Sequence, residues 1–248
     1  MTAIPWIEPH RPLFPSPRTF VQDDPELPDD LLALSDSMDE HLLLTAYRQG
    51  IFPWYSEGQP VMWWCTSPRM VLDTRQINIS DSLRKKLKQV LKNPSWEIKI
   101  DTAFRDVITA CAKSQRKDQD GTWITDEIIE HYAQLNQRGI AHSVETWFED
   151  KLVGGLYGIN LGTMFYGESM FRHVTDASKI ALAALCAWGV EVGIDLIDCQ
   201  QQTSHLKMMG AHPISKDSFL DWIESHIDQP SPTWQWDKSV LYAYNKNS

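Results

Sequence analysis

Two short segments decide how this chain folds, Gly167-Glu168-Ser169-Met170-Phe171 and Leu196-Ile197-Asp198-Cys199-Gln200. Each mixes apolar residues with polar ones near its end, as expected of a strand that delivers side chains to a site. The stretch between them, Thr175 to Val192, has apolar residues at helical spacing and a Thr or Asp that can cap its start. The order strand, helix, strand predicts that Glu168, Asp198 and Gln200 meet on one side of a sheet.

Asp198 and Gln200 are two residues apart, so on a strand their side chains point to the same face. A carboxylate and a carboxamide held together can orient and polarise an incoming amine. No activated Ser, Cys or metal is needed when the other substrate is already an activated ester. The same spacing is also typical of a hydrogen-bonded strand end without a catalytic role, and the pattern alone leaves both interpretations open.

The rest of the chain predicts a mixture of helices and strands. Apolar spacing of the helical kind and capping residues predict helices over 42–49, 80–92, 103–113, 126–137 and 203–209. Short strands are expected over 62–64, 70–72, 98–100, 195–199 and 240–244. From Ser143 the pattern alternates with a period of two, which predicts a meander of three strands over 143–148, 152–159 and 163–170.

The charge is unevenly distributed along the chain. The net charge is −10, yet residues 75–117 hold eleven Lys or Arg and four Asp or Glu, which leaves −17 elsewhere. The densest cations are on the helix predicted over 80–92 and comprise Arg84, Lys85, Lys86, Lys88 and Lys92. They form either a solvated helix face or a stripe that binds a phosphate backbone. A generic nucleic-acid binder is not expected of so acidic a chain.

Composition indicates a globular protein in a reducing compartment. The 248 residues suffice for one large domain or two modest ones, and 42% of them are hydrophobic. No apolar run approaches the ~18 residues of a membrane span, and residues 1–28 lack the pattern of a secretory signal. Cys65, Cys111, Cys186 and Cys199 show no paired spacing, so we expect buried free thiols and a cytoplasmic location.

Several further motifs occur together with these two segments, in a fixed order. They are Ala46-Tyr47-Arg48-Gln49-Gly50-Ile51-Phe52-Pro53-Trp54, Trp63-Trp64 with Ser67-Pro68-Arg69, Gly121-Thr122-Trp123-Ile124-Thr125, Gly139-Ile140-Ala141-His142-Ser143-Val144-Glu145, Leu152-Val153-Gly154-Gly155-Leu156-Tyr157-Gly158 and Met209-Gly210-Ala211. From about Leu31 to about Ala211 the chain therefore resembles the bacterial leucyl/phenylalanyl-tRNA–protein transferases. It departs from them at Leu34-Ser35-Asp36-Ser37-Met38, where that family usually has a Gly-Gly-Asp-Leu turn.

The resemblance implies an α+β fold in two lobes. Residues 1–115 would form a small basic N-terminal lobe, with a Pro-rich lead and the helix that contacts tRNA. Residues 116–248 would form a larger catalytic lobe resembling the acyltransferase fold of the acetyltransferase superfamily (GNAT-like). The implied activity transfers Leu or Phe, and less so Met, from aminoacyl-tRNA to the N-terminal α-amine of proteins beginning with Arg or Lys, which marks them for degradation (the N-end rule).

The resemblance also assigns roles to residues. Asp198 would hydrogen-bond Gln200, Gln200 would accept from the attacking amine, and Glu168 would anchor the positive end of the acceptor. Trp54 and Trp123 would stack on the terminal adenine, although without the resemblance core packing is the simpler role for both. The amino-acid side chain would lie among six apolar residues, Leu156, Phe165, Met170, Leu182, Leu185 and Ile197.

Two other functions compete with this one. An acyl-CoA-dependent N-acyltransferase of the same fold would need a Gly-rich pyrophosphate loop, and the corresponding turn, Arg172-His173-Val174-Thr175-Asp176, has no glycine. A non-catalytic adaptor for basic N-termini would leave the basic stripe and the two tryptophans without a role. His142, His173 and His205 form no metal-ligand spacing. We therefore expect no cofactor, no metal, no membrane partner and a monomer.

Overall fold

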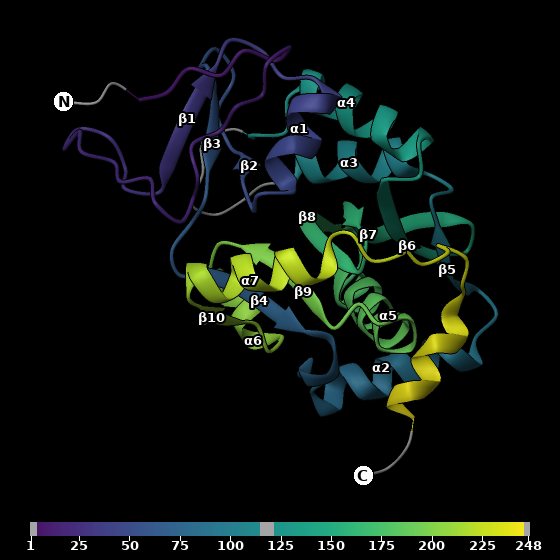
Figure 1. Cartoon of the computed structure of the whole chain (residues 1–248). Helices are drawn as coiled ribbons and strands as arrows, with labels where there is room; N and C mark the ends of the chain where they lie inside the picture. Colours follow the sequence, from purple (N-terminus) through teal and green to yellow (C-terminus); the bar gives the residue numbers. More distant parts are fainter. Residues whose placement is uncertain (1–3, 115–121, 246–248) are drawn as a thin grey trace.

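The structure, a computed structural model, describes residues 4–114 and 122–245. In these residues the strands form two sheets (Figure 1). The smaller one is antiparallel, in the order β1-β3-β2, and comprises β1 (Leu31–Ser35), β3 (Val61–Trp64) and β2 (Phe52–Pro53). Helix α1 (Glu40–Tyr47) joins β1 to β2 and is capped by Asp39, whose side chain accepts from the N–H of Leu42.

The larger sheet has seven strands in the order β10-β4-β9-β8-β7-β6-β5. These are β10 (His212–Ile214), β4 (Arg69–Asp73), β9 (Leu196–Gln200), β8 (Met164–Arg172), β7 (Lys151–Leu161), β6 (Ala141–Phe148) and β5 (Trp96–Ile100). All neighbouring strands are antiparallel except β8 and β9, which are parallel. Because a parallel pair requires a crossover, α5 (Ala177–Val192) connects β8 to β9 across one face of the sheet.

The two faces of this sheet are covered by different helices. Alternate residues of β7 face opposite sides, so Leu156 belongs to one core cluster and Tyr157 to the other. The Leu156 side is covered by α5 and α2 (Asp81–Lys92), and the Tyr157 side by α3 (Phe104–Lys113) and α4 (Asp126–Gln137). At Gly154 an added Cβ would lie 2.5 Å from the Cβ of Ala177, so this glycine lets the start of α5 approach the sheet.

The sheet opens between β8 and β9. Their pairing is limited to Phe165 with Ile197 and Tyr166 with Asp198, although both strands continue beyond these pairs. The residues that follow begin with Gly167 on β8 and Cys199 on β9. They border a fork between two strand ends that are not paired with each other. Helix α6 (Ser204–Met208) follows β9, and α7 (Lys216–His226) follows β10.

Most of the predicted elements are confirmed. Helix α4 has the predicted bounds, and α2 starts at Asp81, so that of the two candidate caps, Ser80 and Asp81, Ser80 is the one used. The meander, α5 and α6 agree within a few residues. The prediction of a strand over 240–244 is wrong, because Lys238–Tyr244 form the 3-10 helix η2. There Val240 and Leu241 pack on the face that α5 and α2 cover, which explains an apolar run that resembles a strand. The sequence did not lead to a prediction of β1, β2, β10 or α7, or of the 3-10 helix η1 (Thr74–Gln76).

The α+β class is confirmed by this mixture of helices and sheets. The division into lobes at residues 115 and 116 stays a prediction, and these two residues lie outside the described ranges. The large sheet takes β4 and β5 from the N-terminal side of that position and five strands from the C-terminal side. All four cysteines are buried and none forms a disulfide, as predicted. In residues 4–114 and 122–245, no helix has the length and apolar character needed to cross a membrane.

The atypical turn after β1 is held by a serine. Ser35 is fully buried, its hydroxyl donates to the carbonyl of Ser37 at 2.9 Å, and it accepts from Trp63 Nε1 at 2.9 Å. The hydroxyl thus bonds the turn to β3.

The tryptophans near the C-terminus fix the last segment to the sheet. Trp234 stacks on His142, with 4.1 Å between ring centroids, and donates from Nε1 to Asn160 Oδ1 at 3.0 Å. Trp236 stacks on Trp188 of α5 at 5.3 Å. Three of the 11 tryptophans of the chain, Trp188, Trp234 and Trp236, therefore pack together at this segment.

Candidate active site

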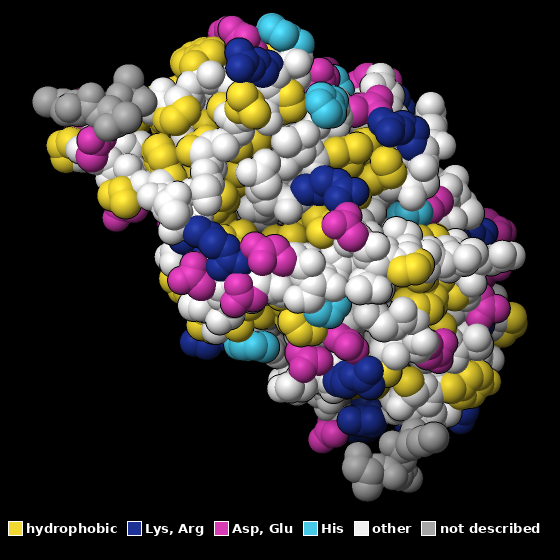
Figure 2. Space-filling view, viewed as in Figure 1, with side chains coloured by type: hydrophobic (Ala, Val, Ile, Leu, Met, Phe, Trp, Pro, Cys, Tyr) yellow, Lys and Arg dark blue, Asp and Glu magenta, His cyan; other side chains and the backbone are white. Residues whose placement is uncertain are grey.

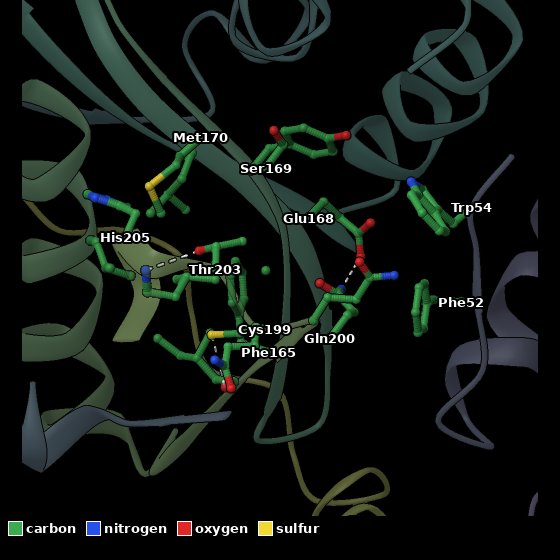
Figure 3. Close-up of a pocket in the computed structure, with 18 of the residues that line it drawn as sticks. Phe52, Trp54, Phe165, Glu168, Ser169, Met170, Cys199, Gln200, Thr203 and His205 are labelled. Atoms are coloured by element: carbon green, nitrogen blue, oxygen red, sulfur yellow. Dashed lines mark hydrogen bonds between the residues drawn. The ribbon is translucent and has the colours of Figure 1, made fainter. Parts of the chain in front are cut away.

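A cavity of about 630 Å³ lies at the fork between β8 and β9. Its walls come from these two strands, from α5 and α6, and from the segment around β2 (Figure 3). The size is suitable for a ligand of drug-like dimensions. In Figure 3, Glu168 and Gln200 lie between Phe52 and Trp54 on one side and Met170 and His205 on the other.

Two β-bulges aim the polar side chains into this cavity. On β8, Tyr157 pairs with Ser169 and Gly158 with Gly167, so Glu168 is the extra, unpaired residue. On β9, Asp198 and Gln200 pair with successive residues of β4, which makes Cys199 the extra residue there. A bulge breaks the alternation of side chains and re-aims them, and bulges are common beside active sites. In a regular strand Phe165 and Met170, five residues apart, would point to opposite faces. The bulge at Glu168 shifts the alternation by one residue, so both pack on the same face.

The carboxylate of Glu168 is surrounded by hydrogen-bond donors. Its Oε1 accepts from the hydroxyl of Tyr47 at 2.7 Å and from Gln200 Nε2 at 3.2 Å, and its Oε2 accepts from the hydroxyl of Tyr132 at 3.4 Å. Burial raises the pKa of Glu168 to about 8, and the nearby Asp198 acts in the same direction, whereas the Tyr47 hydrogen bond and Arg69 oppose the shift. Glu168 is therefore mostly protonated at neutral pH while the cavity holds no cation.

Burial also raises the pKa of Tyr47 and of Tyr132 far above the ordinary value, so each hydroxyl keeps its proton. The two hydroxyl oxygens are 2.5 Å apart. Each hydroxyl has one proton, so when Tyr132 donates to Tyr47 and Tyr47 donates to Glu168, the contact between Tyr132 and Glu168 Oε2 uses the proton of the protonated carboxyl. Tyr47 comes from the end of α1, Tyr132 from α4 and Gln200 from β9, so three separate elements build the surroundings of Glu168.

Asp198 lies behind the cavity and not in its wall. Its side chain has no exposed surface, and its two oxygens accept from Arg69 Nε at 2.8 Å and Nη2 at 2.6 Å. The predicted hydrogen bond with Gln200 exists, but it is made by the backbone N–H of Gln200, which donates to Asp198 Oδ1 at 2.9 Å. Of the three predicted polar residues, Glu168 and Gln200 meet in the cavity, and Asp198 supports Gln200 from behind.

The six predicted apolar pocket residues all line the cavity, from β7, β8, α5 and β9. They are Leu156, Phe165, Met170, Leu182, Leu185 and Ile197. Trp54 and Trp123 line it as well, and Trp123 is 8% exposed. Gly121, in the same motif as Trp123, lies outside the described residues.

The five predicted cations of α2 are not part of this cavity wall. Arg84 Nη1 donates to the carbonyl of Tyr244 at 3.0 Å, and Lys86 Nζ lies 4.3 Å from the centroid of the Trp96 ring. Lys85 and Lys92 are exposed and Lys88 is half-buried. Figure 2 shows Lys and Arg side chains where Figure 1 places α2, with acidic side chains also present on that face. Their contact with tRNA stays a prediction.

Sequence reasoning missed four side chains that shape the site. Tyr47, Phe52 and Arg69 stand in motifs quoted above, and Tyr132 follows on α4. The sequence does not indicate which side chains these four residues contact, because their contact partners lie far away in sequence. Arg69 and Asp198, for instance, are 129 positions apart.

Comparison with known sequences gives a consistent result. Residues 71–224 match the family described as leucyl/phenylalanyl-tRNA protein transferase, and residues 37–67 match the N-terminal domain of the same family. A leucyl/phenylalanyl-tRNA–protein transferase of Cupriavidus pinatubonensis is 54% identical over 239 residues, which cover 96% of this chain and 95% of the relative. The corresponding protein of Cupriavidus metallidurans is 51% identical over 248 residues, 99% of this chain and 98% of the relative.

Among solved structures, a GCN5-related N-acetyltransferase-like protein from Streptococcus suis aligns with a TM-score of 0.30 and 14% identity, over 59% of this chain and 58% of that one. The sequence matches are far stronger than this structural one, and they extend over both sheets and the whole cavity wall. The chain therefore belongs to the leucyl/phenylalanyl-tRNA protein transferase family.

Proposed function

We propose that this protein transfers Leu or Phe, and less so Met, from aminoacyl-tRNA to the N-terminal α-amine of proteins that begin with Arg or Lys. The new peptide bond would mark the acceptor for degradation by the N-end rule, in the cytoplasm. The observation that carries the proposal is the composition of one cavity, where an apolar pocket, a carboxyl–carboxamide pair and two tryptophans adjoin. The family membership of the chain supports the same activity.

The apolar residues suit the side chain of the transferred amino acid. Leu156, Phe165, Leu182, Leu185 and Ile197 are buried, and Met170, partly exposed, adds a flexible thioether that adapts to Leu or Phe. An apolar pocket discriminates by only ~1–3 kcal/mol per methylene, so Met is expected as a weaker substrate. Residues branched at Cβ would be excluded by shape.

The two tryptophans suit the terminal adenosine of tRNA. Stacking of a base on an aromatic ring contributes ~1–3 kcal/mol per base. Trp54 is held by its edge-to-face contact with Trp64, at 5.7 Å between centroids, and its carbonyl accepts from Trp64 Nε1 at 2.7 Å. We propose the exposed cations of α2 as contacts for the tRNA backbone farther from the cavity.

The reaction requires positioning more than acid–base catalysis, because the ester supplies the driving force and no ATP is needed. The amine nitrogen attacks the ester carbonyl, the carbon–oxygen bond to the ribose breaks, and the ribose oxygen leaves with a proton. Gln200 Nε2 donates to Glu168, which directs the carboxamide oxygen of Gln200 to accept from the amine. A carboxamide is a poor base, so the proton moves through substrate hydroxyls or water, and alignment provides most of the rate.

Glu168 would anchor the cationic end of the acceptor. An approaching ammonium or guanidinium group favours the ionised carboxylate, so the pKa of Glu168 falls when the acceptor binds. The cost of ionising a buried carboxyl is then offset only by a cationic acceptor, which would favour Arg and Lys at the acceptor N-terminus.

The test is transfer of radiolabelled Phe from Phe-tRNA to a protein that begins with Arg. Acid-stable label is expected on this acceptor and not on the same protein with its N-terminus acetylated. Label that forms without tRNA, or no label at all, rejects the proposal. Gln200→Ala should lower kcat at least ~100-fold, whereas Gln202→Ala, at the exposed rim of the same cavity, should retain activity.

We also propose the two-lobe, GNAT-like organisation for this chain, and a monomer in solution. The crossover α5 between the parallel strands β8 and β9, with the cavity at their fork, supports an acyltransferase scaffold. Scattering in solution tests the monomer, and limited proteolysis around residue 115 tests the lobes.

A further inference from the structure

The main chain of Gln200 is held in an uncommon conformation. Its φ is +52°, in the left-handed region that residues other than glycine seldom adopt. Both of its peptide groups are bonded. The N–H donates to Asp198 Oδ1 at 2.9 Å, and the carbonyl accepts from Thr66 Oγ1 at 3.0 Å. A conformation of this kind persists where surrounding contacts determine it.

Asp198 is itself held on its other side by Arg69. The guanidinium makes two hydrogen bonds to the carboxylate, and neither side chain has exposed surface. The same guanidinium lies between two aromatic rings, 4.7 Å from the centroid of Phe52 and 4.4 Å from that of Phe219. Burial alone would lower the pKa of Arg69, but the pair with Asp198 raises it above the ordinary value, so Arg69 stays charged.

We propose that Thr66 and Arg69 are positioning residues for the Gln200 carboxamide, Thr66 by holding the Gln200 carbonyl and Arg69 by fixing Asp198. Neither residue is part of the cavity wall, so each acts through Gln200. Arg69 begins β4 and Thr66 lies in the connection before it, and one segment therefore holds both peptide groups. This inference rests on the proposed function, in which Gln200 orients the attacking amine.

The geometry explains why small displacements matter. The Gln200 side chain leaves the main chain between the two held peptide groups, and its Nε2 lies 3.2 Å from Glu168 Oε1. A rotation of the unsupported peptide would move the carboxamide out of hydrogen-bond range of both Glu168 and an incoming amine. The loss would appear in turnover, while the apolar pocket and both tryptophans keep their places.

Thr66→Val is the first test, because valine has nearly the shape of threonine but no hydroxyl. We expect kcat to fall about tenfold, while the KM for Phe-tRNA and the midpoint of thermal unfolding stay close to wild type. Thr66→Ser, which keeps the hydroxyl, should restore kcat to within about twofold. A hydroxyl with only a structural role would lower the unfolding midpoint and leave kcat per folded molecule unchanged, and that result overturns the proposal for Thr66.

Arg69→Lys is the second test. Lysine keeps the charge but lacks the planar fork that contacts both carboxylate oxygens. We expect a fall in kcat of about tenfold or more for the folded protein, and the combined Asp198→Asn and Arg69→Lys variant should lose no more than the worse single variant. Additive losses overturn the link through Asp198. Because Thr66 is only partly buried, its two variants test the proposal even if the Arg69 variants fold poorly.

These results are separable from a failure of the proposed function. If wild-type protein transfers no Phe, the proposed function is wrong. If wild-type protein is active and Thr66→Val matches it in kcat, only the positioning role is wrong.

Discussion

Replacing Glu168 by Gln should change how the stability of the protein depends on pH. Glu168 has a pKa of about 8 in the folded protein and about 4.5 when unfolded. Between these values the folded state binds more protons than the unfolded state, so the free energy of unfolding falls as pH rises. The stabilising contribution of the protonated carboxyl is complete below pH 4.5 and is lost as the pH rises through about 8.

The size of this effect follows from the pKa shift. A shift from 4.5 to about 8 corresponds to about 5 kcal/mol. Glu168 is partly open to the cavity, and water there reduces the penalty, so we expect a fall of about 2–3 kcal/mol between pH 5 and pH 8. Glu168→Gln carries a neutral side chain of the same shape and should show no such fall from this position.

Urea unfolding at intervals from pH 5 to pH 8.5 measures the effect directly. Other titrating groups contribute equally to both proteins, so the difference between wild type and Glu168→Gln isolates this carboxyl. Glu57→Gln, at an exposed position, should follow the wild-type curve. A difference between wild type and Glu168→Gln that stays constant over this range would falsify the account of Glu168 as a buried, protonated carboxyl.

Three further predictions concern specificity, packing and tRNA. Leu182→Ala enlarges the apolar pocket and should shift the ratio of kcat/KM for Phe over Leu about tenfold towards Phe; an unchanged ratio would place the amino acid elsewhere. A Cβ added at Gly154 would lie 2.5 Å from the Cβ of Ala177 at the start of α5. Gly154→Val should therefore destabilise the protein by about 1–3 kcal/mol, measured as a lower unfolding midpoint in urea. Lys85→Ala with Lys92→Ala should weaken Phe-tRNA binding and flatten its salt dependence by about one to two units of log–log slope. Lys151→Ala, equally exposed, should leave that slope unchanged, and a flat response to both changes would remove α2 from the tRNA contact.

Local sequence was enough to predict the elements that carry strong local signals. Ser80 or Asp81 as cap and the apolar spacing of Leu83, Leu87 and Leu91 predicted the helix over 80–92, and in α2 Ser80 is the cap and Val90 is buried with Leu83 and Leu87. The helix predicted over 126–137 has the same bounds in the structure. The two segments around α5 were predictable from alternation and helical spacing, whereas the six apolar residues of the cavity were predicted from the resemblance to the transferase family.

Features that depend on distant partners were not predictable in this way. The ion pair of Arg69 with Asp198 links positions far apart, and no local pattern identifies it. The bulges at Glu168 and Cys199 are set by the neighbouring strands and carry no local signal of their own. Alternation therefore assigned Asp198 and Gln200 to one face, whereas the bulge at Cys199 leaves Gln200 in the cavity wall and Asp198 behind it. In η2 a short apolar run was ambiguous between strand and helix, and packing against α5 and α2 decided it.

The position of β4 in the large sheet has a consequence for biosynthesis. Both neighbours of β4, which are β9 and β10, leave the ribosome more than 120 residues later, since β4 ends at Asp73 and β9 begins at Leu196. Until then Arg69 lacks its partner Asp198, and β4 has no neighbouring strand in the large sheet. An unpaired strand of this kind is exposed to misassembly. If Gln200 of β9 orients the acceptor as proposed, a chain terminated anywhere before Leu196 lacks it, and nascent or truncated products would not modify other proteins.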